Sequence, residues 1–373
     1  MHVPFINLNR LVDQVKDEVL LDWQECLDNT EFVGGPSVDK LEKNLQDELD
    51  VSSFVACSNG TDALVVALKA LGVKAGSRVA LPNMTFWAPY EAIVQVGAEP
   101  VLVDIDPDDL QMSFSEFKDA HERFGFDAAI LVHLFGWSSR FVREYRAYCQ
   151  EKNILLIEDG AQCYGVELSG EPLLAKATVG TLSFYPAKVL GASGDAGGIT
   201  ASDIKLGDKI RALCNHGRAG HYTYDYVGFN ARLGSLQAKF LLRVLEKMPE
   251  VLTSRRQAEA FYQEFFAAHQ DLCHIYRAPE GQKTNGYLNV LTAHGHSGDD
   301  LVRELSKRGI GAARTYPQCL NEQPPAAKAL RASDLAVSRQ FSSKVINLPL
   351  FAGITLEECQ ASANALLDIL TGK

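Results

Sequence analysis

Short apolar runs alternate with amphipathic segments over roughly residues 50–200. Five of these runs have the length of a buried strand: Phe54–Cys57, Val79–Leu81, Pro100–Val103, Ala128–Val132 and Ile154–Ile157. The segments between the runs have helical periodicity, near residues 61–72, 85–96, 113–123 and 139–150. Buried strands that alternate with helices are typical of βαβ units. The pattern therefore predicts an α/β fold in which helices sandwich a mainly parallel sheet.

The chain after this alternating region has a less regular pattern. Shorter apolar runs occur at Thr181–Tyr185 and Gly198–Ala201, and a helical stretch then extends from about residue 233 to residue 266. This stretch contains Pro249, which cannot donate a backbone hydrogen bond. We therefore expect a break or a kink in the helix there.

The C-terminal part has the pattern of a smaller α+β domain. A candidate strand at Tyr287–Leu291 precedes helical patterns near 297–309 and 355–371. A length of 373 residues also suggests about two domains. We predict a large domain over residues 1–250, which begins with a helical arm, and a small α+β domain over residues 251–373.

Composition narrows the classes of function. The formal net charge is −11 at pH 7, which argues against a nucleic-acid partner because binding a phosphate backbone requires a basic face. The 8 cysteines form no C-x-x-C pair and no zinc-ligand spacing with histidines, so we expect reduced core residues and no metal. No apolar run has the length of a membrane span, and the first residues lack the pattern of a signal peptide. We therefore expect a cytoplasmic protein without membrane insertion.

The residues that follow each apolar run are the first candidates for a site, because ligands of open α/β sheets bind beyond the carboxyl ends of the strands. The first run is followed by SNGTDAL (58–64), in which Gly60 permits a tight turn and Thr61 is a suitable helix N-cap. A helix N-terminus with free N–H groups binds anions such as phosphate. The same turn could also simply start a helix.

Aromatic and acidic side chains follow later runs. Phe86 and Trp87 come after the second run, where they could form a flat wall for a ring or belong to the core. Glu158, Asp159 and Gln162 follow the run at 154–157. A carboxylate there could be catalytic, bind a metal or cap a helix. It could also pair with a protonated ring nitrogen, with Gln162 hydrogen-bonded to a ring oxygen.

Lys188 has an unusual setting for a lysine. It directly follows a predicted strand and lies between an aromatic-proline turn and the glycine-rich segment GASGDAGG (191–198). Most lysines are solvated at the surface, whereas this setting favours an amine held at a fixed point. A nucleophilic lysine must be partly desolvated or lie beside a cation to be neutral at pH 7.

An anion-binding turn, an aromatic wall, a carboxylate and a lysine thus follow successive strands. Pyridoxal 5'-phosphate (PLP) requires these groups: a lysine that forms a Schiff base with it, an acid that faces the pyridine nitrogen, a phosphate cup and a stacking partner. The sequence therefore predicts a PLP enzyme in which Lys188 and one acid of the pair Glu158 and Asp159 are catalytic.

Eight motifs occur along nearly the whole chain: SNGTDAL (58–64), TFWA (85–88), VHLFG (132–136), EDGAQ (158–162), SFYPAKVLGASGDAGG (183–198), NHGR (215–218), GFNARL (228–233) and NLPLF (347–351). In these motifs and their order the chain resembles the DegT/DnrJ/EryC1/StrS sugar aminotransferases. The resemblance implies the fold type I of PLP-dependent transferases, with a seven-stranded type of sheet in the large domain and a smaller C-terminal domain.

The resemblance also implies roles for single residues. Lys188 stands where the family attaches its cofactor, and Asp159 would pair with the pyridine nitrogen. Asn230 would reach into the neighbouring subunit's site, which implies a homodimer with shared active sites, and Arg232 and His216 are further neighbours of the site. The other implied cofactor contacts are Gln162 at the ring hydroxyl, Phe86 or Trp87 stacked on the ring, and Gly60, Thr61 and Ser183 at the phosphate.

The motif spellings bear on the substrate. Gly160 replaces a frequent alanine, and Ala187-Lys188-Val189 replaces a frequent Thr-Lys-Asn, which removes one polar contact beside the lysine. TFWAP, HLFGW and EDGAQC together are similar to the branch that aminates UDP-2-acetamido-3-keto sugars for diamino-sugar lipid A or other surface glycans. The resemblance thus implies transfer of an amino group from L-glutamate to a nucleotide-linked keto sugar. A 4-keto-6-deoxy nucleotide sugar is the alternative substrate.

Three other functions were weighed against this one. A sugar dehydratase of the same fold would have histidine in place of Lys188. A non-catalytic PLP-binding regulator would need a partner-binding or DNA-binding element, and the chain has no basic helix-turn-helix pattern. A Rossmann dehydrogenase would need G-x-G-x-x-G after the first strand, where the chain has SNGTDAL.

Overall fold

Eight strands form the central sheet of the computed structural model, which describes residues 1–373. β9 is antiparallel to both of its neighbours, and every other pairing is parallel. The predicted α/β class and mainly parallel sheet are confirmed. In spatial order the strands are β1 (Ser53–Cys57), β9 (Gly197–Ala201), β8 (Val179–Ser183), β5 (Leu155–Asp159), β4 (Ala128–Val132), β2 (Arg78–Pro82), β3 (Glu99–Val103) and β13 (Leu330–Arg331).

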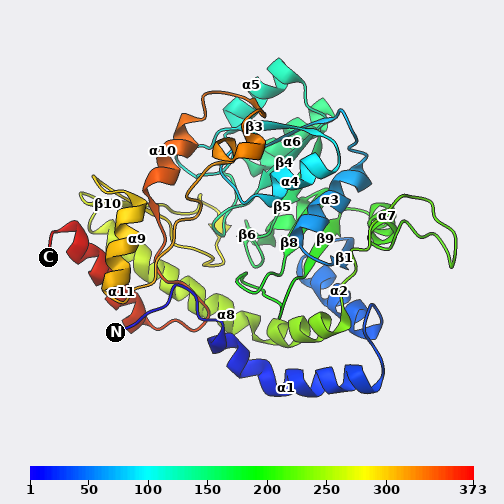
Figure 1. Cartoon of the computed structure of the whole chain (residues 1–373), viewed down its shortest axis with the longest axis horizontal. Helices are drawn as coiled ribbons and strands as arrows, with labels where there is room; N and C mark the ends of the chain where they lie inside the picture. The colour runs from blue at the N-terminus through cyan, green and yellow to red at the C-terminus, as the bar shows by residue number, and fades with distance from the viewer.

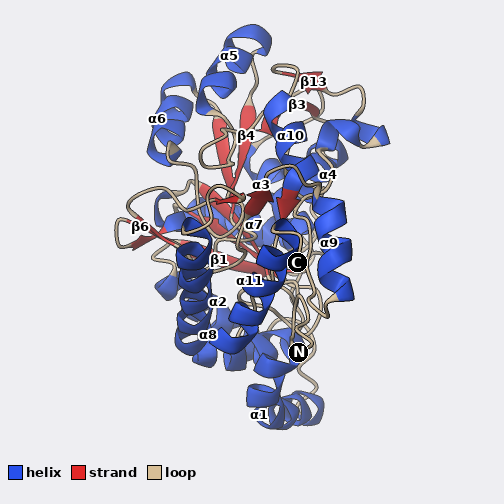
Figure 2. Ribbon diagram, turned by 90° about the vertical axis from the view of Figure 1, so that its left-hand side faces the viewer, coloured by secondary structure: helices blue, strands red, loops and turns tan.

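Helices cover both faces of this sheet (Figures 1 and 2). One face packs against α3 (Gly60–Leu71), α4 (Ala88–Gln95) and α7 (Ile204–Cys214). The other face packs against α2 (Pro36–Glu48), α5 (Phe114–Phe124), α6 (Val142–Lys152) and the first half of α8 (Ser235–Ala267). Alternate residues of one strand enter different cores, as the period of two requires: Val79 and Leu81 of β2 face α3, and Ala80 faces α5 and α6.

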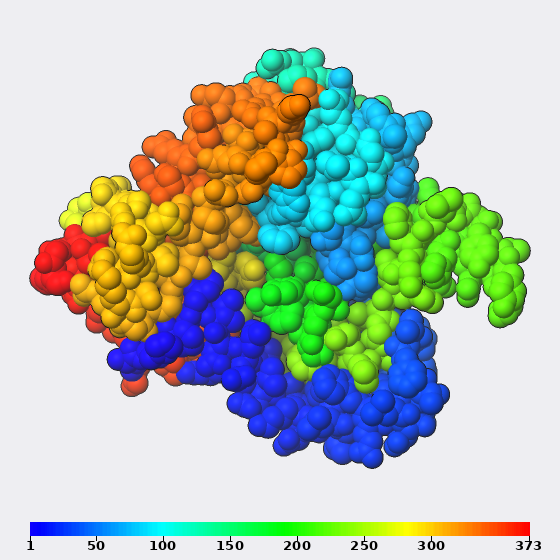
Figure 3. Space-filling model, viewed as in Figure 1, coloured from blue at the N-terminus to red at the C-terminus, as the bar shows by residue number.

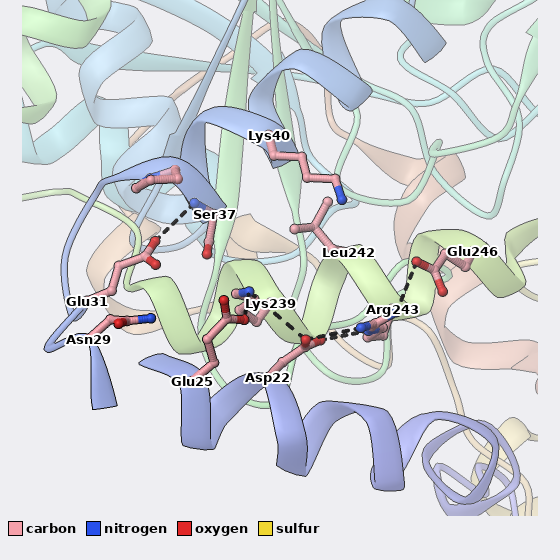
Figure 4. A pocket seen from close by; sticks show the side chains of 11 residues that line it. Asp22, Glu25, Asn29, Glu31, Ser37, Lys40, Lys239, Leu242, Arg243 and Glu246 are labelled. Carbon is pink, nitrogen blue, oxygen red and sulfur yellow. Dashed lines mark hydrogen bonds and ion pairs between the residues drawn. The ribbon is translucent and has the colours of Figure 1, made fainter. Parts of the chain in front are cut away.

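The helical arm predicted at the N-terminus contains α1 (Asn9–Asp28), which lies along α8. Arg243 pairs with Asp22 at 2.6 Å and Lys239 with Glu25 at 2.8 Å, and these pairs line a charged hollow of about 700 Å³ between α1, α2 and α8 (Figure 4). Because most of its charges neutralise one another, we regard this hollow as a seam between helices. It is not a candidate ligand site.

A second core lies at the other end of α8. It is formed by β10 (Cys273–Ile275), β12 (Leu291–Ala293), β14 (Val345–Ile346), α9 (Gly298–Lys307) and α11 (Leu356–Leu370). The intervening α10 (Ala336–Lys344) packs on the large core instead, through Phe341. The predicted boundary at residues 250 and 251 falls inside α8 and stays a prediction. A third, small sheet comprises β6 (Glu167–Leu168), β7 (Glu171–Pro172) and β11 (Gln282–Lys283).

One local prediction was wrong, and another was wrong in part. The candidate strand at Tyr287–Leu291 reaches only its last residue, where β12 begins. Side-chain amides take the place of a strand ladder before it: Asn347 donates to the carbonyl of Asn289 at 2.7 Å, and Asn289 accepts from the N–H of Leu348 at 2.8 Å. The predicted break in α8 is absent, because the helix continues through Pro249 as one element, whereas the kink stays a prediction.

All eight cysteines are buried and unpaired. None of the helices combines the length and the apolar character that crossing a bilayer requires.

Candidate active site

A cavity of about 780 Å³ opens at the carboxyl ends of the central strands. Its walls come from the start of α3, the ends of β4, β5 and β8, and loop residues of the C-terminal part such as Tyr287 and Tyr316. Trp87 and Asn230 do not line it. Seven of the nine predicted site residues do: Gly60, Thr61, Phe86, Asp159, Gln162, Ser183 and Lys188.

The predicted phosphate residues gather around the N-terminus of α3. The expectation of Thr61 as N-cap was wrong, because Asn59 caps the helix by accepting from the N–H of Asp62 at 2.8 Å. Gly60 and Thr61 therefore form the first turn, where backbone N–H groups have no partner within the helix. A Cβ on Gly60 would lie 2.8 Å from Cβ of Ser183, so only glycine allows α3 to approach the end of β8 this closely. The cluster has the donors that a phosphate requires.

Glu158 and Asp159 end β5 and point to opposite faces of the sheet. Glu158 is buried beside α6, where Arg146 donates to it at 2.8 Å and His133 Nε2 lies 2.9 Å from its other oxygen. Burial disfavours its charge, but these hydrogen bonds outweigh burial and hold the pKa of Glu158 below its usual value.

Asp159 instead faces the cavity, where Oδ1 accepts from the N–H of Ala161 at 3.0 Å. Burial raises the pKa of Asp159, and the N–H of Ala161 and the Lys188 charge partly offset this effect. The sequence left both acids as candidates. The structure makes Asp159 the acid of the cavity and Glu158 an anchor for α6.

Gln162 and the two adjacent aromatic residues have distinct surroundings. Gln162 accepts from the N–H of Phe135 at 2.6 Å and donates to Tyr316 Oη at 2.9 Å, which fixes its amide at the cavity wall. Phe86 projects into the cavity, with its ring centroid 6.3 Å from that of Tyr316. Trp87 turns away and packs against Tyr90, with the ring centroids 4.7 Å apart and the rings tilted by 33°. Of the two candidate stacking residues, Phe86 alone lines the cavity.

Lys188 lies in the loop that joins the antiparallel neighbours β8 and β9. Backbone hydrogen bonds from Phe184 to Ala196 at 2.8 Å and from Ala192 to Phe184 at 2.7 Å close this loop on itself. Nζ of Lys188 donates to Tyr287 Oη at 3.4 Å. The loop thus presents the amine to the cavity that also contains Asp159.

Tyr287 and Tyr316 were missed by sequence reasoning. Both line the cavity, but they lie 99 and 128 residues beyond Lys188 in the chain, in loops without regular periodicity. The glycine of the motif VHLFG, Gly136, gave an indirect indication of this contact. A Cβ at position 136 would lie 3.1 Å from Cβ of Tyr287, so the close approach of Tyr287 favours glycine there.

Asn230 lies outside the cavity of its own chain, at the base of a projecting arm (residues 215–230). A bridge between Asn215 and Asn230 closes the arm, which extends away from the molecule as a green loop (Figures 1 and 3). Its tip is exposed and apolar, with Val227 95% and Tyr222 80% accessible. Arg232 Nη2 donates to Asn230 Oδ1 at 2.7 Å.

Comparison with known families matches residues 13–367 to the model of the DegT/DnrJ/EryC1/StrS aminotransferase family. The chain belongs to this family. As a member, this aminotransferase is an enzyme that uses PLP and acts on sugars, which excludes the dehydrogenase interpretation.

Three relatives illustrate the range of substrates among similar proteins. The UDP-N-acetyl-3-dehydro-α-D-glucosamine 3-aminotransferase of Acidithiobacillus ferrooxidans is 30% identical, over 99% of this chain and 98% of that protein. The UDP-2-acetamido-2-deoxy-3-oxo-D-glucuronate aminotransferase of Pseudomonas aeruginosa is 32% identical, over 93% and 95%. The dTDP-3-amino-3,4,6-trideoxy-α-D-glucose transaminase of Streptomyces venezuelae is 28% identical, over 96% and 93%.

Solved structures agree with this aminotransferase over its whole length. A DegT/DnrJ/EryC1/StrS aminotransferase from Brucella abortus superposes with a TM-score of 0.94 at 29% identity, covering 100% of both chains. NtdA of Bacillus subtilis, solved with the bound cofactor PMP, superposes with a TM-score of 0.91 at 26% identity, covering 99% of this chain and 85% of that one.

The cavity of this aminotransferase fits PLP. The first turn of α3 and Ser183 would hold the phosphate, Phe86 would cover the ring, and Asp159 would face the pyridine nitrogen. When bound, PLP supplies an electron sink for charge that develops on the substrate carbon. Asp159 would keep the ring nitrogen protonated, and the amine of Lys188 would take a proton from one carbon and return it to another.

Proposed function

We propose that this aminotransferase moves the amino group of L-glutamate to the ketone of a UDP-2-acetamido-3-keto-glucose-type sugar, for diamino-sugar lipid A or another surface glycan. The observation that carries the proposal is that the two relatives named as acting on UDP-linked 3-keto sugars are the more similar of the three compared. A 4-keto-6-deoxy nucleotide sugar remains the second candidate, because other family members act on different sugars. A cytoplasmic location stays a prediction, which cell fractionation would test.

A substrate panel tests the choice of sugar. We expect release of 2-oxoglutarate from glutamate with UDP-2-acetamido-3-keto-glucose, and at least about tenfold lower kcat/KM with 4-keto-6-deoxy nucleotide sugars, which corresponds to about 1.4 kcal/mol of discrimination. The control is glutamate without sugar, which permits a single turnover only. Preferred use of a 4-keto sugar would replace the first candidate with the second.

We also propose a homodimer in which each cavity is completed by the partner. The cavity of one chain contains four acids and only one cation, Lys188. Its expected ligands, a phosphate ester, a nucleotide diphosphate and glutamate, are all anionic, so further cations are needed. The projecting arm carries Arg218 and leads to Arg232, and its exposed apolar tip needs cover. A second copy of the chain would supply the missing cations to the cavity and would cover the apolar tip of the arm.

Mixing two inactive variants tests this shared site. Asn230→Ala and Lys188→Ala homodimers are each expected to be impaired, because every site then lacks one group. In a mixed dimer, one of the two sites combines the intact Lys188 of one chain with the intact Asn230 of the other. Random exchange makes about half of the dimers mixed, so activity should return to about a quarter of the wild-type value. A sedimentation measurement checks that both variants remain dimers.

The double variant Asn230→Ala/Lys188→Ala, mixed with wild type, is the matched control. If Asn230 serves the cavity of its own chain, mixing the two single variants restores nothing, and the shared-site proposal is wrong.

A further inference from the structure

Tyr287 contacts the amine of Lys188 across the cavity. Nζ donates to its phenol oxygen at 3.4 Å and lies 5.2 Å from the centre of its ring. No carboxylate lies within ion-pair distance of this amine, and the phenol is its one hydrogen-bond partner in the structure. The two residues come from segments about 100 positions apart in the chain, so the contact depends on the tertiary fold.

A buried amide fixes the position of Tyr287. The side chain of Asn285 is fully buried and donates to the carbonyls of Gln162 at 2.9 Å and Tyr164 at 2.8 Å. Its oxygen accepts from the N–H of Tyr287 at 2.9 Å. Asn285 therefore ties the tyrosine to the loop that follows Asp159. Burying an amide without these partners would be costly, so the three bonds specify one arrangement.

Close packing supports the same arrangement from two other sides. Gly136 has φ of +92°, and a Cβ there would lie 2.3 Å from Asn285 Oδ1, so a side chain at position 136 would displace the tyrosine's support. On another side, the buried Arg255 donates to the carbonyl of Gly286 at 3.2 Å. The backbone around Tyr287 is thus fixed by specific hydrogen bonds as well as by packing.

The chemistry of Lys188 explains why a phenol suits this place. The lysine leaves the cofactor and returns to it in each turnover, so its amine is free for part of the cycle. A free amine alternates between an ammonium, which only donates hydrogen bonds, and a neutral form, which also accepts one. A carboxylate can only accept, so it favours the ammonium over the neutral amine, whereas a phenol can accept from either form and can also donate to the neutral amine.

We propose that Tyr287 is a positioning residue for Lys188, whose phenol holds the released amine at the reacting carbon in both of its protonation states. The proposal rests on Lys188 as the point of cofactor attachment. It does not depend on which sugar is the substrate.

Tyr287→Phe tests the proposal because it removes only the oxygen and keeps the ring. In glutamate half-reactions followed by stopped flow, we expect the maximal rate constant to fall by about tenfold to a hundredfold, with the apparent dissociation constant for glutamate changed by less than about threefold. The second measurement is the rate at which cofactor-free protein attaches added PLP, followed by visible absorbance as a function of pH. The phenol oxygen accepts a stronger hydrogen bond from the ammonium of Lys188 than it makes with the neutral amine. Without this oxygen the ammonium is less stabilised, so the profile of PLP attachment should move to lower pH.

Tyr145→Phe is the matched control. Its phenol is fully buried and donates to the carbonyl of Met112 at 2.8 Å, on the other face of the sheet. This variant should keep the wild-type half-reaction rates and attachment profile. Unchanged rates and profile in Tyr287→Phe, or a weaker apparent affinity for glutamate with an unchanged maximal rate constant, would overturn the proposal. If the wild-type protein attaches no PLP, then Lys188 is not the attachment point. This result differs from a failure of the Tyr287 proposal, in which the wild-type protein attaches PLP and Tyr287→Phe behaves like it.

Discussion

Lys188→Ala is expected to lower turnover by at least about 10⁴-fold while the protein keeps its fold and can still bind PLP. The reason is that the amine of Lys188 is the one basic nitrogen that lines the cavity. No neighbouring group can take over both cofactor attachment and proton transfer. The measurement is 2-oxoglutarate release with glutamate and the preferred sugar, together with borohydride reduction and peptide mapping of the labelled lysine.

Two variants control for this prediction. Lys188→Arg keeps a cation near Tyr287 but cannot attach PLP, so it should be as inactive as Lys188→Ala. Lys176→Ala removes an exposed lysine outside the cavity and should be unaffected. Turnover near the wild-type rate in either Lys188 variant would remove this residue from the mechanism.

Asp159→Asn is expected to lower kcat by about 10³-fold, with a smaller effect on protein stability. The amide keeps the size of the carboxylate and can still accept from the N–H of Ala161, but it loses the charge that would hold a proton on the ring nitrogen. The measurements are kcat with glutamate and the preferred sugar, the single-turnover rate constant of each half-reaction, and the visible spectrum of the bound cofactor.

Asp109→Asn is the matched control for Asp159→Asn. Asp109 is also a buried carboxylate that accepts from backbone N–H groups, those of Gln111 and Arg140, but it lies outside the cavity. Burial raises the pKa of Asp109 to about 6, but each of its two oxygens accepts from a backbone N–H. Asp109→Asn should therefore lower stability at least as much as Asp159→Asn while the folded protein keeps its activity. If both variants lose activity equally, the effect of Asp159 is on folding rather than on the cofactor.

The sequence was informative where chemistry follows a regular element. Gly60, Asp159 and Lys188 each lie just beyond the end of a predicted strand, Ser183 lies within one, and the sheet topology brings them together. The strand positions were therefore enough to place most of one cavity wall. The strand pattern alone left Glu158 and Asp159 open, because either register of a short apolar run is possible until the helix that covers each face is known. The family resemblance implied Asp159, and the structure places this residue at the cavity wall.

The opposite wall could not be predicted. Tyr287 and Tyr316 reach the cavity through loops whose course is set by side-chain amides such as Asn285. Such long-range hydrogen bonds leave no periodic pattern in the sequence. The N-cap of α3 was misplaced for a related reason: Asn59 and Thr61 are both good caps, and the close approach of α3 to β8 decides between them.

The unbroken course of α8 has a consequence for how the molecule can come apart. Its 33 residues extend for about 50 Å at the usual rise of 1.5 Å per residue. Leu241 and Val244 belong to the core beneath the large sheet, and Tyr262 and Phe266 belong to the core of the small sheet. If either half of α8 unfolds, the core that packs on the other half loses part of its support, so unfolding should be cooperative across both cores. Truncation at residue 250 would leave two fragments, each with an exposed apolar helix face.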